Sequence, residues 1–589
     1  RVVAIFLAVA CLLTLVACSE DASSATTGTT ASTTSTTAAT ERSTQPATAG
    51  NQKETMEEIL NTTQDPWSGN QNDAAFEGDM PYSLPLSDDT LEISIWGSTP
   101  AADSGMIDLN DSVAWQEVSK RLNVKIDWHH PTIGQESVQF NLMIASQQLT
   151  DLINGTSYYI GGFDKYIDQG SIRDLTELVP EYCKNYMLRR TVDDECMRQS
   201  ITDSNRIAAV WNINPYWQPC WIGPCARTDW MEEWGYTSED LETYDGWYSF
   251  LSKAKESGVE SPYTVSATTG LDPDLTNGYN IGAWPTGGRN GWYQLDGTVY
   301  YGGYVDEFRD YLEMFSKWYA EGLIDQDFYS RTSADRESLA LNSKAAIARI
   351  GFNNLDRYDA QTVDSGTWTP IEIPTPEKDT VRYYHSGNTS QRCKDCCTTV
   401  STSCDESKLP MIMKFLDYFF TQEGRILSNY GVEGVSFYYA DDGQPVLYDE
   451  ILNNPDGISA TAMIQKYCIY QTGIANMFDY RREFSSTMLE KARTECGIIW
   501  DTDVEGINKL YAVDIAPEYA TEYTSKFSDC DTYMQEWSLS VMTGLVELND
   551  ETWNEYIAEL ENLGIKECIE WYQQAWDNYL NRDVTVGYN

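Results

Sequence analysis

Histidine is scarce in this sequence, and the common catalytic motifs are missing. The three histidines are His129, His130 and His385. The patterns G-x-S-x-G, G-x-x-x-x-G-K-[ST] and H-E-x-x-H do not occur. They supply, in order, an activated serine, a cradle for nucleotide phosphates and the ligands of a catalytic zinc. The sequence therefore gives no support to a serine hydrolase, a nucleotide-binding protein or a zinc protease.

Basic residues are also few. Lys and Arg total 40 against 90 Asp and Glu, which gives a formal net charge of −50. Nucleic acids and anionic membrane surfaces are bound through positive patches that release counterions. We therefore expect no nucleic-acid partner. The acidity weakly favours a neutral ligand over a strongly anionic one, although a local site can differ from the mean.

Two segments imitate metal sites without completing them. Residues 501–506 resemble the first half of a calcium loop, but the twelfth position is Ala512 instead of Glu. A four-thiolate zinc site normally uses two separated cysteine pairs, and two members of the cysteine cluster here are adjacent. Disulfides or buried thiols therefore fit the cluster better than zinc, and we predict no metal and no cofactor. The cluster consists of Cys393, Cys396, Cys397 and Cys404.

The start of the chain carries a long apolar run. Arg1 precedes the run, which covers residues 2–17 and is followed by Cys18. The final Leu-Val-Ala-Cys resembles the lipobox of a bacterial lipoprotein. The alternative is a membrane anchor or a buried segment, but the run is shorter than the roughly 20 residues that a spanning helix needs. We predict that residues 1–17 are a signal peptide and that Cys18 is lipidated, which holds the protein on the outer face of a cell membrane.

The segment after Cys18 is poor in apolar residues. It consists mainly of Ser, Thr and Ala as far as residue 50 and stays polar to about residue 86. Such a composition cannot bury enough apolar surface to offset the entropy lost on ordering. We predict that residues 18–86 form a disordered Ser/Thr-rich tether.

Cysteine usage fits an exported protein. If Cys11 leaves with the signal peptide and Cys18 carries lipid, twelve of the fourteen cysteines remain. An even number in an oxidising compartment indicates disulfides. Sequence cannot fix their connectivity. The pairs that we suggest are Cys183 with Cys196, Cys220 with Cys225, Cys468 with Cys496, and Cys530 with Cys568.

Hydrophobic periodicity predicts an α/β fold. Alternating apolar residues predict strands over residues 91–96 and 124–128, with a helix over 112–122 between them. A second helix, with Val138, Leu142 and Ala145 on one face, leads to a short apolar strand at 152–153. This alternation indicates a parallel sheet covered by helices. Later stripes predict core-facing helices: Phe308, Tyr311, Leu312, Phe315, Trp318 and Tyr319 before Gly322; Met411, Ile412, Phe415, Leu416 and Phe419 after Pro410; Trp553, Tyr556, Ile557 and Leu560 before Gly564; and Ile569, Tyr572, Trp576 and Leu580.

Aromatic residues are abundant in loop-like sequence. The chain has 19 Trp and 38 Tyr, many of them beside Gly or Pro. Aromatic residues recur through the segment 211–221, and Trp284 and Trp292 flank a Gly-rich turn. A ring presents a flat apolar face and a polar edge, which suits the C–H face and hydroxyl rim of a sugar. Each ring by itself is more often structural, but as a set they favour a carbohydrate cleft.

Six short segments together resemble a known family. They match the extracellular solute-binding lipoproteins, family 1, of bacterial carbohydrate ABC importers, in the long-chain branch of Gram-positive bacteria. Each segment is weak alone, but their order is fairly specific. The segments are Phe140-Asn-Leu-Met-Ile-Ala-Ser with Asp151-Leu-Ile; Gly170-Ser-Ile-Arg-Asp-Leu-Thr; Arg227-Thr-Asp-Trp-Met-Glu-Glu-Trp-Gly; Trp318-Tyr-Ala-Glu-Gly-Leu-Ile-Asp; Asn429-Tyr-Gly-Val-Glu-Gly-Val; and Trp553-Asn-Glu-Tyr with Leu563-Gly.

The resemblance implies the two-lobed type II periplasmic-binding-protein fold of maltose-binding protein, with a ligand cleft between two α/β lobes. The extra cysteines between Cys393 and Cys404 depart from the family's usual pattern. The predicted boundaries are 87–210 for the first part of lobe 1, 211–384 for the first part of lobe 2, 385–440 for the second part of lobe 1, and 441–589 for a helical part that belongs mainly to lobe 2.

The function implied is capture of a sugar or oligosaccharide and its delivery to ABC permease subunits, by a monomer that performs no chemistry. The alternative is a surface glycoside hydrolase or lyase, whose pair of carboxylates could be drawn from 90 acidic residues. A third hypothesis is an adhesin or scaffold. Ligands of parallel sheets bind at the carboxyl ends of strands. The predicted binding residues are Trp96, Trp128, Tyr158, Tyr159, Trp217, Trp284, Trp292, Tyr384 and Glu433.

Overall fold

The computed structural model describes most of the chain from residue 82 onward. The predicted signal peptide, Cys18, most of the tether and the calcium-like segment 501–506 lie outside the described residues. In the described part, no helix is long and apolar enough to cross a membrane. The described residues are 82–155, 158–191, 194–213, 220–282, 291–382, 393–441, 443, 445–452, 454, 458–470, 472–478, 496, 499–500, 510 and 513–588.

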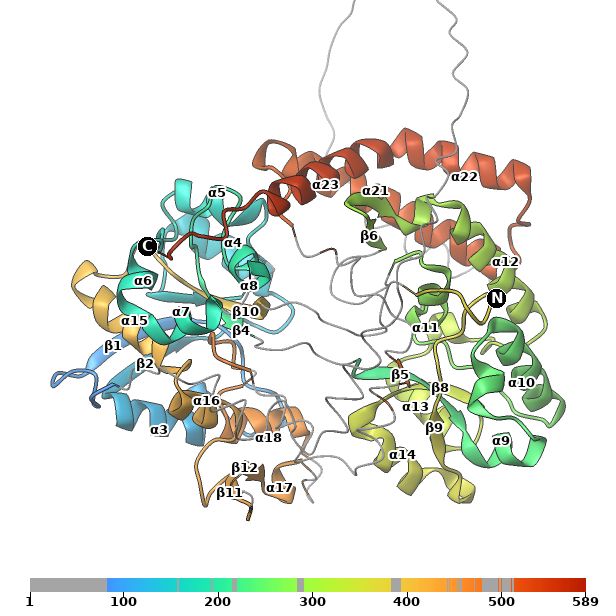
Figure 1. The fold of residues 1–589 in the computed structure, drawn as a ribbon, viewed down its shortest axis with the longest axis horizontal. Helices are drawn as coiled ribbons and strands as arrows, with labels where there is room; N and C mark the ends of the chain where they lie inside the picture. The colour runs from blue at the N-terminus through green and yellow to red at the C-terminus, as the bar shows by residue number, and fades with distance from the viewer. Residues whose placement is uncertain are drawn as a thin grey trace, which may run out of the picture. The chain divides into compact units, whose positions relative to one another are not determined.

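The first sheet has five strands in the order β2-β1-β3-β10-β4. The first strand pairs in parallel with β2 and β3, whereas β10 runs antiparallel to both of its neighbours. Helix α3 (Val113–Leu122) joins β1 to β2 and lies alongside them in Figure 1. The predicted strand-helix-strand unit is therefore confirmed, and β1, β2 and β3 are parallel as predicted. The sheet as a whole is mixed, because β10 inserts antiparallel between β3 and β4. The strands are β1 (Leu91–Trp96), β2 (Val124–His129), β3 (Leu152–Asn154), β4 (Val210–Ile213) and β10 (Cys393–Val400).

The next helix forms as predicted but buries a different face. Helix α4 covers Glu136–Ser146, and Phe140 is its buried residue. Val138 and Leu142, which we expected in the core, are 55% and 63% exposed. The helix carries apolar residues on both faces. The face with Phe140 is the buried one, because this ring packs against Trp96 at 5.8 Å.

The second sheet has three strands in the order β8-β5-β9. They are β5 (Ile222–Arg227), β8 (Ile347–Gly351) and β9 (Trp368–Pro370), and β5 runs antiparallel to both neighbours. In Figure 1 these strands lie with α13 (Ser333–Leu341) and α14 (Leu355–Gln361). Two short hairpins complete the described strands: β6 (Trp292–Leu295) with β7 (Thr298–Tyr301), and β11 (Phe437–Tyr439) with β12 (Pro445–Leu447).

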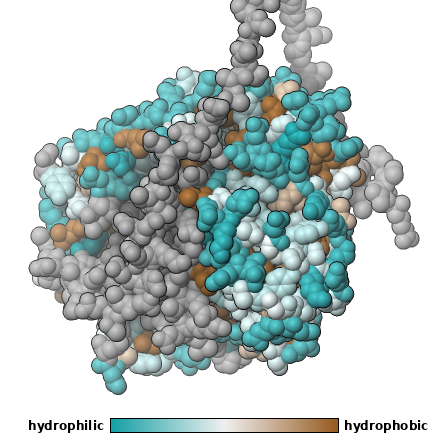
Figure 2. Space-filling view, turned by 45° about the vertical axis from the view of Figure 1, so that its right-hand side comes forward, coloured by the Kyte–Doolittle hydropathy of each residue, from teal (hydrophilic) through white to brown (hydrophobic). Residues whose placement is uncertain are grey.

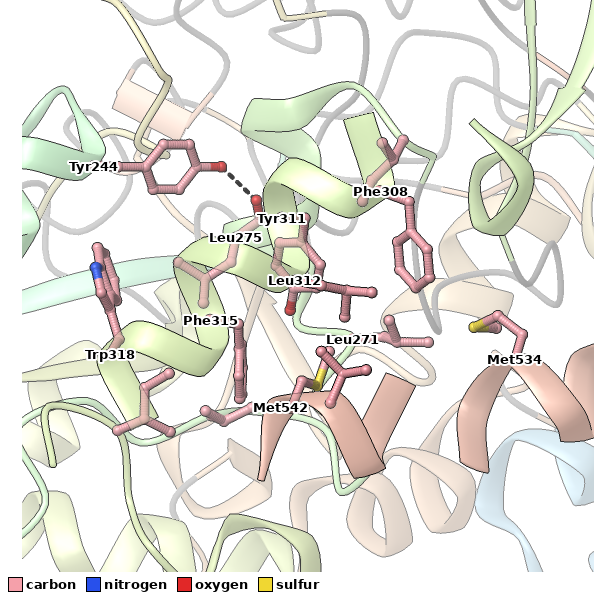
Figure 3. Close-up of a cluster of buried hydrophobic side chains, with 14 of the residues drawn as sticks. Tyr244, Leu271, Leu275, Phe308, Tyr311, Leu312, Phe315, Trp318, Met534 and Met542 are labelled. Carbon is pink, nitrogen blue, oxygen red and sulfur yellow. Dashed lines mark hydrogen bonds between the residues drawn. The ribbon is translucent and has the colours of Figure 1, made fainter. Parts of the chain in front are cut away.

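The largest hydrophobic core forms around α12 (Asp306–Ala320), whose predicted stripe is confirmed. Five residues of the stripe are buried and Tyr319 is partly buried. Helix α12 ends where Gly322 takes a φ of 67°, and the Leu323 N–H donates to Trp318 O at 2.9 Å. Met534 and Met542 from α21 (Pro517–Met542) pack into the same core. Figure 3 shows this packing around Phe308, Tyr311, Leu312, Phe315 and Trp318.

The last two helices confirm one stripe and correct the other. Helix α22 (Asp550–Leu563) buries Trp553, Tyr556 and Leu560 and ends at Gly564. Helix α23 (Ile565–Leu580) ends at Leu580, which is 46% exposed and does not belong to the core. Leu580 is the last helical residue, so few side chains can cover it. The buried face of α23 instead consists of Ile565, Cys568, Tyr572, Ala575, Trp576 and Tyr579.

The remaining helices pack around these two groups of strands. Helix α15 begins beside Pro410 as predicted, and four of the five predicted apolar residues join the core of the first sheet. The fifth, Met411, is half-buried outside this core. The surface in Figure 2 is mainly hydrophilic where residues are described, with brown side chains scattered over it. The helices are α5 (Gly162–Asp168), α6 (Leu178–Tyr182), α7 (Lys184–Arg190), α8 (Asp194–Gln199), α9 (Thr228–Trp234), α10 (Tyr244–Glu256), α11 (Pro273–Thr276), α15 (Leu409–Tyr418), α16 (Gln422–Asn429), α17 (Asp449–Leu452) and α18 (Ala460–Tyr467).

The C-terminal third of the chain contributes residues to the two largest hydrophobic cores. Ile469, Ile474 and Met477 lie beyond the predicted boundary at residue 440, yet they pack into the core of the first sheet. The segment after α23 also bonds to α7 and to the turn after α8. Arg190 Nη1 of α7 donates to Val586 O at 2.8 Å, and Arg582 Nε donates to Asp203 Oδ1 of that turn at 2.7 Å. The domain boundaries stay predictions.

Asp417 on α15 fixes the start of α7. Its carboxylate accepts hydrogen bonds from the backbone N–H groups of Asn185 at 3.2 Å and Tyr186 at 2.6 Å. It also accepts from Asn185 Nδ2 at 2.7 Å and from the Tyr82 hydroxyl. The first N–H groups of a helix lack partners within that helix. Asp417 supplies them from a neighbouring helix, and burial raises the pKa of this carboxyl.

The twelve cysteines after Cys18 are all described, and all but Cys396 are buried. Cys183 Sγ donates to Met413 O at 3.3 Å, while Cys393 Sγ donates to Cys196 O at 3.7 Å. Burial, followed by the neighbouring Cys530, raises the pKa of Cys568 to about 12. Within the described residues no group of three or more acidic, His or Cys side chains is arranged to hold a metal ion. The twelve described cysteines form no disulfide in this structure, so the suggested pairings are not borne out by it.

Candidate functional site

A cavity of about 540 Å³ lies where β1 and β3 end. Trp96 is the last residue of β1, and Asn154 is the last residue of β3. Carboxyl ends of parallel strands are the usual ligand position in open α/β sheets. We call this cavity the β1–β3 pocket. Its lining residues are Trp96, Gly97, Ser98, Thr99, Pro131, Ile133, Glu136, Asn154, Gly155, Tyr158, Asn212, Cys396, Gln465, Tyr470, Gly473, Ile474 and Asn476.

Glycine allows the two strand ends to converge. A Cβ atom on Gly97 would lie 2.8 Å from Asn154 Nδ2, and one on Gly473 would lie 2.6 Å from Ser98 Oγ. Both distances are shorter than ordinary contacts, and Gly473 also has a φ of 88°, which disfavours other residues. The glycines therefore leave the amide of Asn154 and the hydroxyl of Ser98 at the wall of the pocket.

Two aromatic rings form one side of the pocket. Trp96 and Tyr158 meet edge to face, with ring centroids 5.4 Å apart and an interplanar angle of 85°. Phe140 of α4 supports both rings from the core, at 5.8 Å and 5.5 Å. Tyr470 is a third lining ring and packs on Phe478 at 4.8 Å. Tyr158 and Tyr470 are partly exposed, so ring surface remains for a ligand.

Buried amides supply hydrogen-bonding groups. Asn154 and Asn476 are only 3% and 2% exposed. Asn154 Oδ1 accepts from Thr398 Oγ1 at 2.8 Å, and Asn212 Oδ1 accepts from the Asn476 N–H at 2.8 Å. Asn154 Nδ2 and Asn476 Oδ1 have no hydrogen-bond partner among the described residues. A buried polar atom without a partner costs about 1 to 3 kcal/mol, which a ligand hydroxyl could offset.

One carboxylate lines the β1–β3 pocket among the described residues, that of Glu136. Its Oε1 accepts from the Gly134 N–H at 2.9 Å. Hydrogen bonds from its own backbone N–H and from Gly134 lower the pKa of Glu136, so it is ionised at neutral pH. Hydrolysis of a glycosidic bond normally requires two carboxylates on opposite sides of that bond. The described lining therefore offers hydrogen-bond donors and acceptors for binding, but it does not offer two carboxylates that could form a catalytic pair.

A second cavity of about 420 Å³ lies at the carboxyl end of β8. We call it the β8 pocket. Arg357 of α14 donates two hydrogen bonds to Glu337 of α13, at 2.7 Å and 3.1 Å, and Arg349 pairs with the buried Asp274. The lining residues are Trp221, Ile222, Thr264, Ser266, Pro273, Ser333, Arg336, Glu337, Ala348, Arg349, Ile350, Gly351, Asn354, Arg357 and Tyr358.

Thr332 caps α13, the helix that carries Arg336 and Glu337 of the β8 pocket. Removing its hydroxyl should therefore destabilise this helix. Its hydroxyl accepts from the Asp335 N–H at 3.2 Å, and the Asp335 carboxylate accepts from the Thr332 N–H at 2.9 Å. We expect Thr332→Ala to lower the free energy of unfolding by about 1 kcal/mol, the usual value of such a cap. Chemical denaturation measures this. A change below a few tenths would contradict the assignment, and Thr332→Ser, which keeps the hydroxyl, is the control.

The predicted residues Trp96 and Tyr158 both line the β1–β3 pocket. The neighbouring Tyr159 is buried, and its hydroxyl hydrogen-bonds to Thr399 Oγ1 at 2.8 Å. Trp217, Trp284 and Tyr384 lie outside the described residues. Binding roles for these residues stay predictions.

Three further predicted residues lie away from both pockets. Trp128 is buried against Trp115, with ring centroids 5.1 Å apart. Trp292 is buried and stacks on Tyr572 at 4.5 Å. Glu433 is exposed in the turn before β11. The two tryptophans thus contribute to cores in this structure, and Glu433 contributes to neither pocket lining.

Several lining residues escaped the sequence analysis. Asn154 directly follows the predicted strand at 152–153, so the rule that ligands bind after strand ends would have found it. Asn212 and Trp221 belong to the aromatic segment 211–221, which we singled out for its rings without selecting them. Tyr470 and Asn476 come from distant sequence and reach the pocket only through tertiary packing. The sequence contains no local pattern that marks them.

A curated bacterial lipoprotein is distantly similar to this chain in sequence. No protein-family model matches the chain. A lipoprotein of Bacillus subtilis (strain 168), LipO, is 22% identical over 372 residues, which cover 60% of this chain and 69% of LipO. Identity at this level shows similarity to LipO and does not by itself establish a shared ligand.

Solved structures resemble most of the chain. The alginate-binding protein AlgQ2 without calcium ion has a TM-score of 0.66 at 22% identity, covering 84% of this chain and 100% of AlgQ2. An extracellular solute-binding protein from Bifidobacterium longum subsp. infantis has a TM-score of 0.67 at 14% identity, covering 84% and 99%. FusA, an ABC-transporter substrate-binding protein of S. pneumoniae in complex with kestose, has a TM-score of 0.64 at 16% identity, covering 84% and 100%. The chain therefore has the two-lobed type II periplasmic-binding-protein fold of extracellular solute-binding proteins, as the family resemblance predicted.

Proposed function

We propose that this protein is a lipid-anchored extracellular substrate-binding protein, which captures a sugar or oligosaccharide and delivers it to an ABC transporter permease. The observation that carries the proposal is the composition of the β1–β3 pocket. Partly exposed rings lie beside buried amides, and Asn154 Nδ2 and Asn476 Oδ1 of these amides have no hydrogen-bond partner among the described residues. Rings bind the C–H faces of sugars, and amides bind their hydroxyl groups.

The similar solved structures support a saccharide as the ligand class. AlgQ2 is an alginate-binding protein, and FusA was solved in complex with kestose. FusA is described as an ABC-transporter protein, and this supports a permease as the partner. We further propose that the protein acts as a monomer, because one chain of this fold provides both walls of a cleft.

We propose that the β1–β3 pocket and the β8 pocket are two halves of one binding site. Each lies at the carboxyl end of a strand in a different sheet, and each contains an aromatic residue and polar side chains. In a two-lobed fold, hinge bending can close such halves around a ligand. The closed form would then report occupancy to the permease. The chemistry required is capture and release, for which no nucleophile or cofactor is needed.

A saccharide screen tests this proposal. The full chain is titrated with a panel of oligosaccharides while thermal stability and tryptophan fluorescence are recorded. We expect saturable binding, with stabilisation of about 2.7 kcal/mol at a ligand concentration 100 times Kd. Mass spectrometry of the ligand should show no shortened product. Cleavage would favour the hydrolase or lyase hypothesis, and absence of binding to every saccharide would contradict the proposal.

The proposed anchor is tested separately through Cys18. We expect Cys18→Ala to move the protein from the membrane fraction to the medium or the wash, because the lipid-bearing thiol is lost. Saccharide affinity should stay unchanged, since Cys18 precedes the described fold. Cell fractionation followed by a binding titration measures both quantities. Retention of the variant in the membrane fraction would contradict the proposed anchor and would leave the binding proposal intact.

A further inference from the structure

The β8 pocket gathers cations in a strongly acidic chain. Among its described lining residues are three arginines and one carboxylate, whereas the whole sequence has a net charge of −50. Two of the arginines are compensated within the protein. Arg357 is paired with Glu337, and Arg349 is paired with Asp274. The remaining charge belongs to Arg336.

The hydrogen-bond acceptors of Arg336 are uncharged groups. Its Nη1 donates to Arg331 O at 2.9 Å, and its Nη2 donates to Ser333 Oγ at 3.1 Å. No carboxylate of a described residue lies within 4.0 Å of its guanidinium nitrogens. The side chain is partly buried in the wall of the pocket. A partly buried guanidinium that has no carboxylate within hydrogen-bonding distance is a site at which an anion would be favoured.

The acidic residues around Arg336 accept their hydrogen bonds from other groups. Asp325 accepts from Arg331 Nε at 2.8 Å. Asp335 accepts from Thr332, and Asp272 accepts from the backbone N–H groups of residues 266 and 274. These carboxylates favour the charged form of Arg336 from a distance, while burial lowers its pKa. None of the three carboxylates accepts a hydrogen bond from the Arg336 guanidinium, which donates to Arg331 O and Ser333 Oγ.

An aromatic surface shares this pocket. Trp221 is 40% exposed, a high value for tryptophan, and it lines the cavity together with Arg336. Thr264 and Asn354 add a hydroxyl and an amide to the lining. An indole face suits a sugar ring, and a guanidinium suits a carboxylate or sulfate attached to that ring. The combination matches an acidic sugar better than a neutral one.

We infer that the β8 pocket binds an acidic sugar unit of the ligand, in which a carboxylate or sulfate group pairs with Arg336 and the ring packs on Trp221. This inference rests on the proposed function, because it specifies the ligand class of the same site. It also differs from the neutral ligand that the overall composition favours. At this site the charge of Arg336 outweighs the net negative charge of the chain, because exposed acidic residues are screened beyond about 8 Å at physiological salt.

The test compares acidic saccharides with their neutralised counterparts. The full chain is applied to an array of neutral, uronate-containing and sulfated oligosaccharides, with trigalacturonate among the probes. Each bound glycan is then titrated beside its carboxyl-reduced or desulfated form, which separates a carboxylate ligand from a sulfate ligand. We expect the acidic form to bind at least tenfold more tightly and its affinity to fall as NaCl is raised.

Variants assign that preference to one residue. Arg336→Gln should weaken binding of the acidic form about tenfold and leave the neutral form within twofold, whereas Arg336→Lys should retain a preference for the acidic form. Arg309→Gln is the matched control, because it removes the same charge from an arginine of α12 that pairs with Asp550 and does not line the pocket.

The failures of the two proposals can be distinguished. Binding of neutral glycans only, or equal affinity for the acidic and neutralised forms, would overturn the inference and leave the proposed function standing. An equal loss of both affinities in Arg336→Gln would also overturn it, since that pattern indicates a structural role. Absence of binding to every glycan of the array would contradict the proposed function itself.

Discussion

Asp417→Ala is expected to lower the free energy of unfolding by about 3 to 5 kcal/mol. The change removes the acceptor of two backbone N–H groups at the start of α7, of Asn185 Nδ2 and of the Tyr82 hydroxyl. Each buried donor left without an acceptor costs about 1 to 3 kcal/mol, and loss of the buried carboxylate's own desolvation cost offsets part of the sum. Urea denaturation followed by far-UV circular dichroism measures the effect.

Asp405→Ala is the matched control for this prediction. Asp405 also caps a helical turn, through the Ser407 N–H at 2.8 Å, but it is exposed. We expect this variant to cost about 1 kcal/mol, the usual value of an exposed cap. Equal effects of the two variants would show that burial of the Asp417 cluster does not matter, and the account of how α15 fixes α7 would be wrong.

Tyr158→Ala is expected to weaken saccharide binding about 30-fold, which corresponds to ~2 kcal/mol. The ring is a partly exposed wall of the β1–β3 pocket and is held in place by Trp96 and Phe140. Removing it deletes the surface on which we propose that a sugar ring packs. Calorimetric titration of the full chain with a bound saccharide measures the change.

Two controls separate binding from folding in this experiment. Tyr158→Phe keeps the ring and should retain affinity within a few fold. Tyr588→Ala removes an exposed ring that lines neither pocket and should leave affinity unchanged. Thermal denaturation of each variant shows whether the fold persists. Full affinity in a folded Tyr158→Ala variant would exclude this wall from the binding site.

The fold was predictable where one face of an element is clearly apolar. The stripe on α12 and the alternation in β1 each leave a single way to bury the apolar side. The buried face of α4 was not predictable in this way, because Phe140 lies on one apolar face of the helix and Val138 and Leu142 lie on another. Their relative burial depends on neighbours from other parts of the chain, which periodicity cannot describe.

The candidate site was predictable only where it follows a strand. The rule that ligands bind at strand ends selects Trp96 and Tyr158, which line the pocket. It also selects Trp128, but that residue is in phase with Val124 and Ile126, the buried positions of β2, so its side chain enters the core. Arg336 lies on a helix of the other sheet, and sequence gives no indication that its neighbouring carboxylates are already engaged.

The decisive experiment is a structure of the full chain with a bound oligosaccharide. We expect one ligand that contacts both pockets, with a sugar ring against Tyr158, hydroxyl groups bonded to Asn154 and Asn476, and another unit against Trp221. A ligand confined to one pocket would contradict the joint site. A ligand bound away from both pockets would contradict the assignment of strand ends as the site of capture.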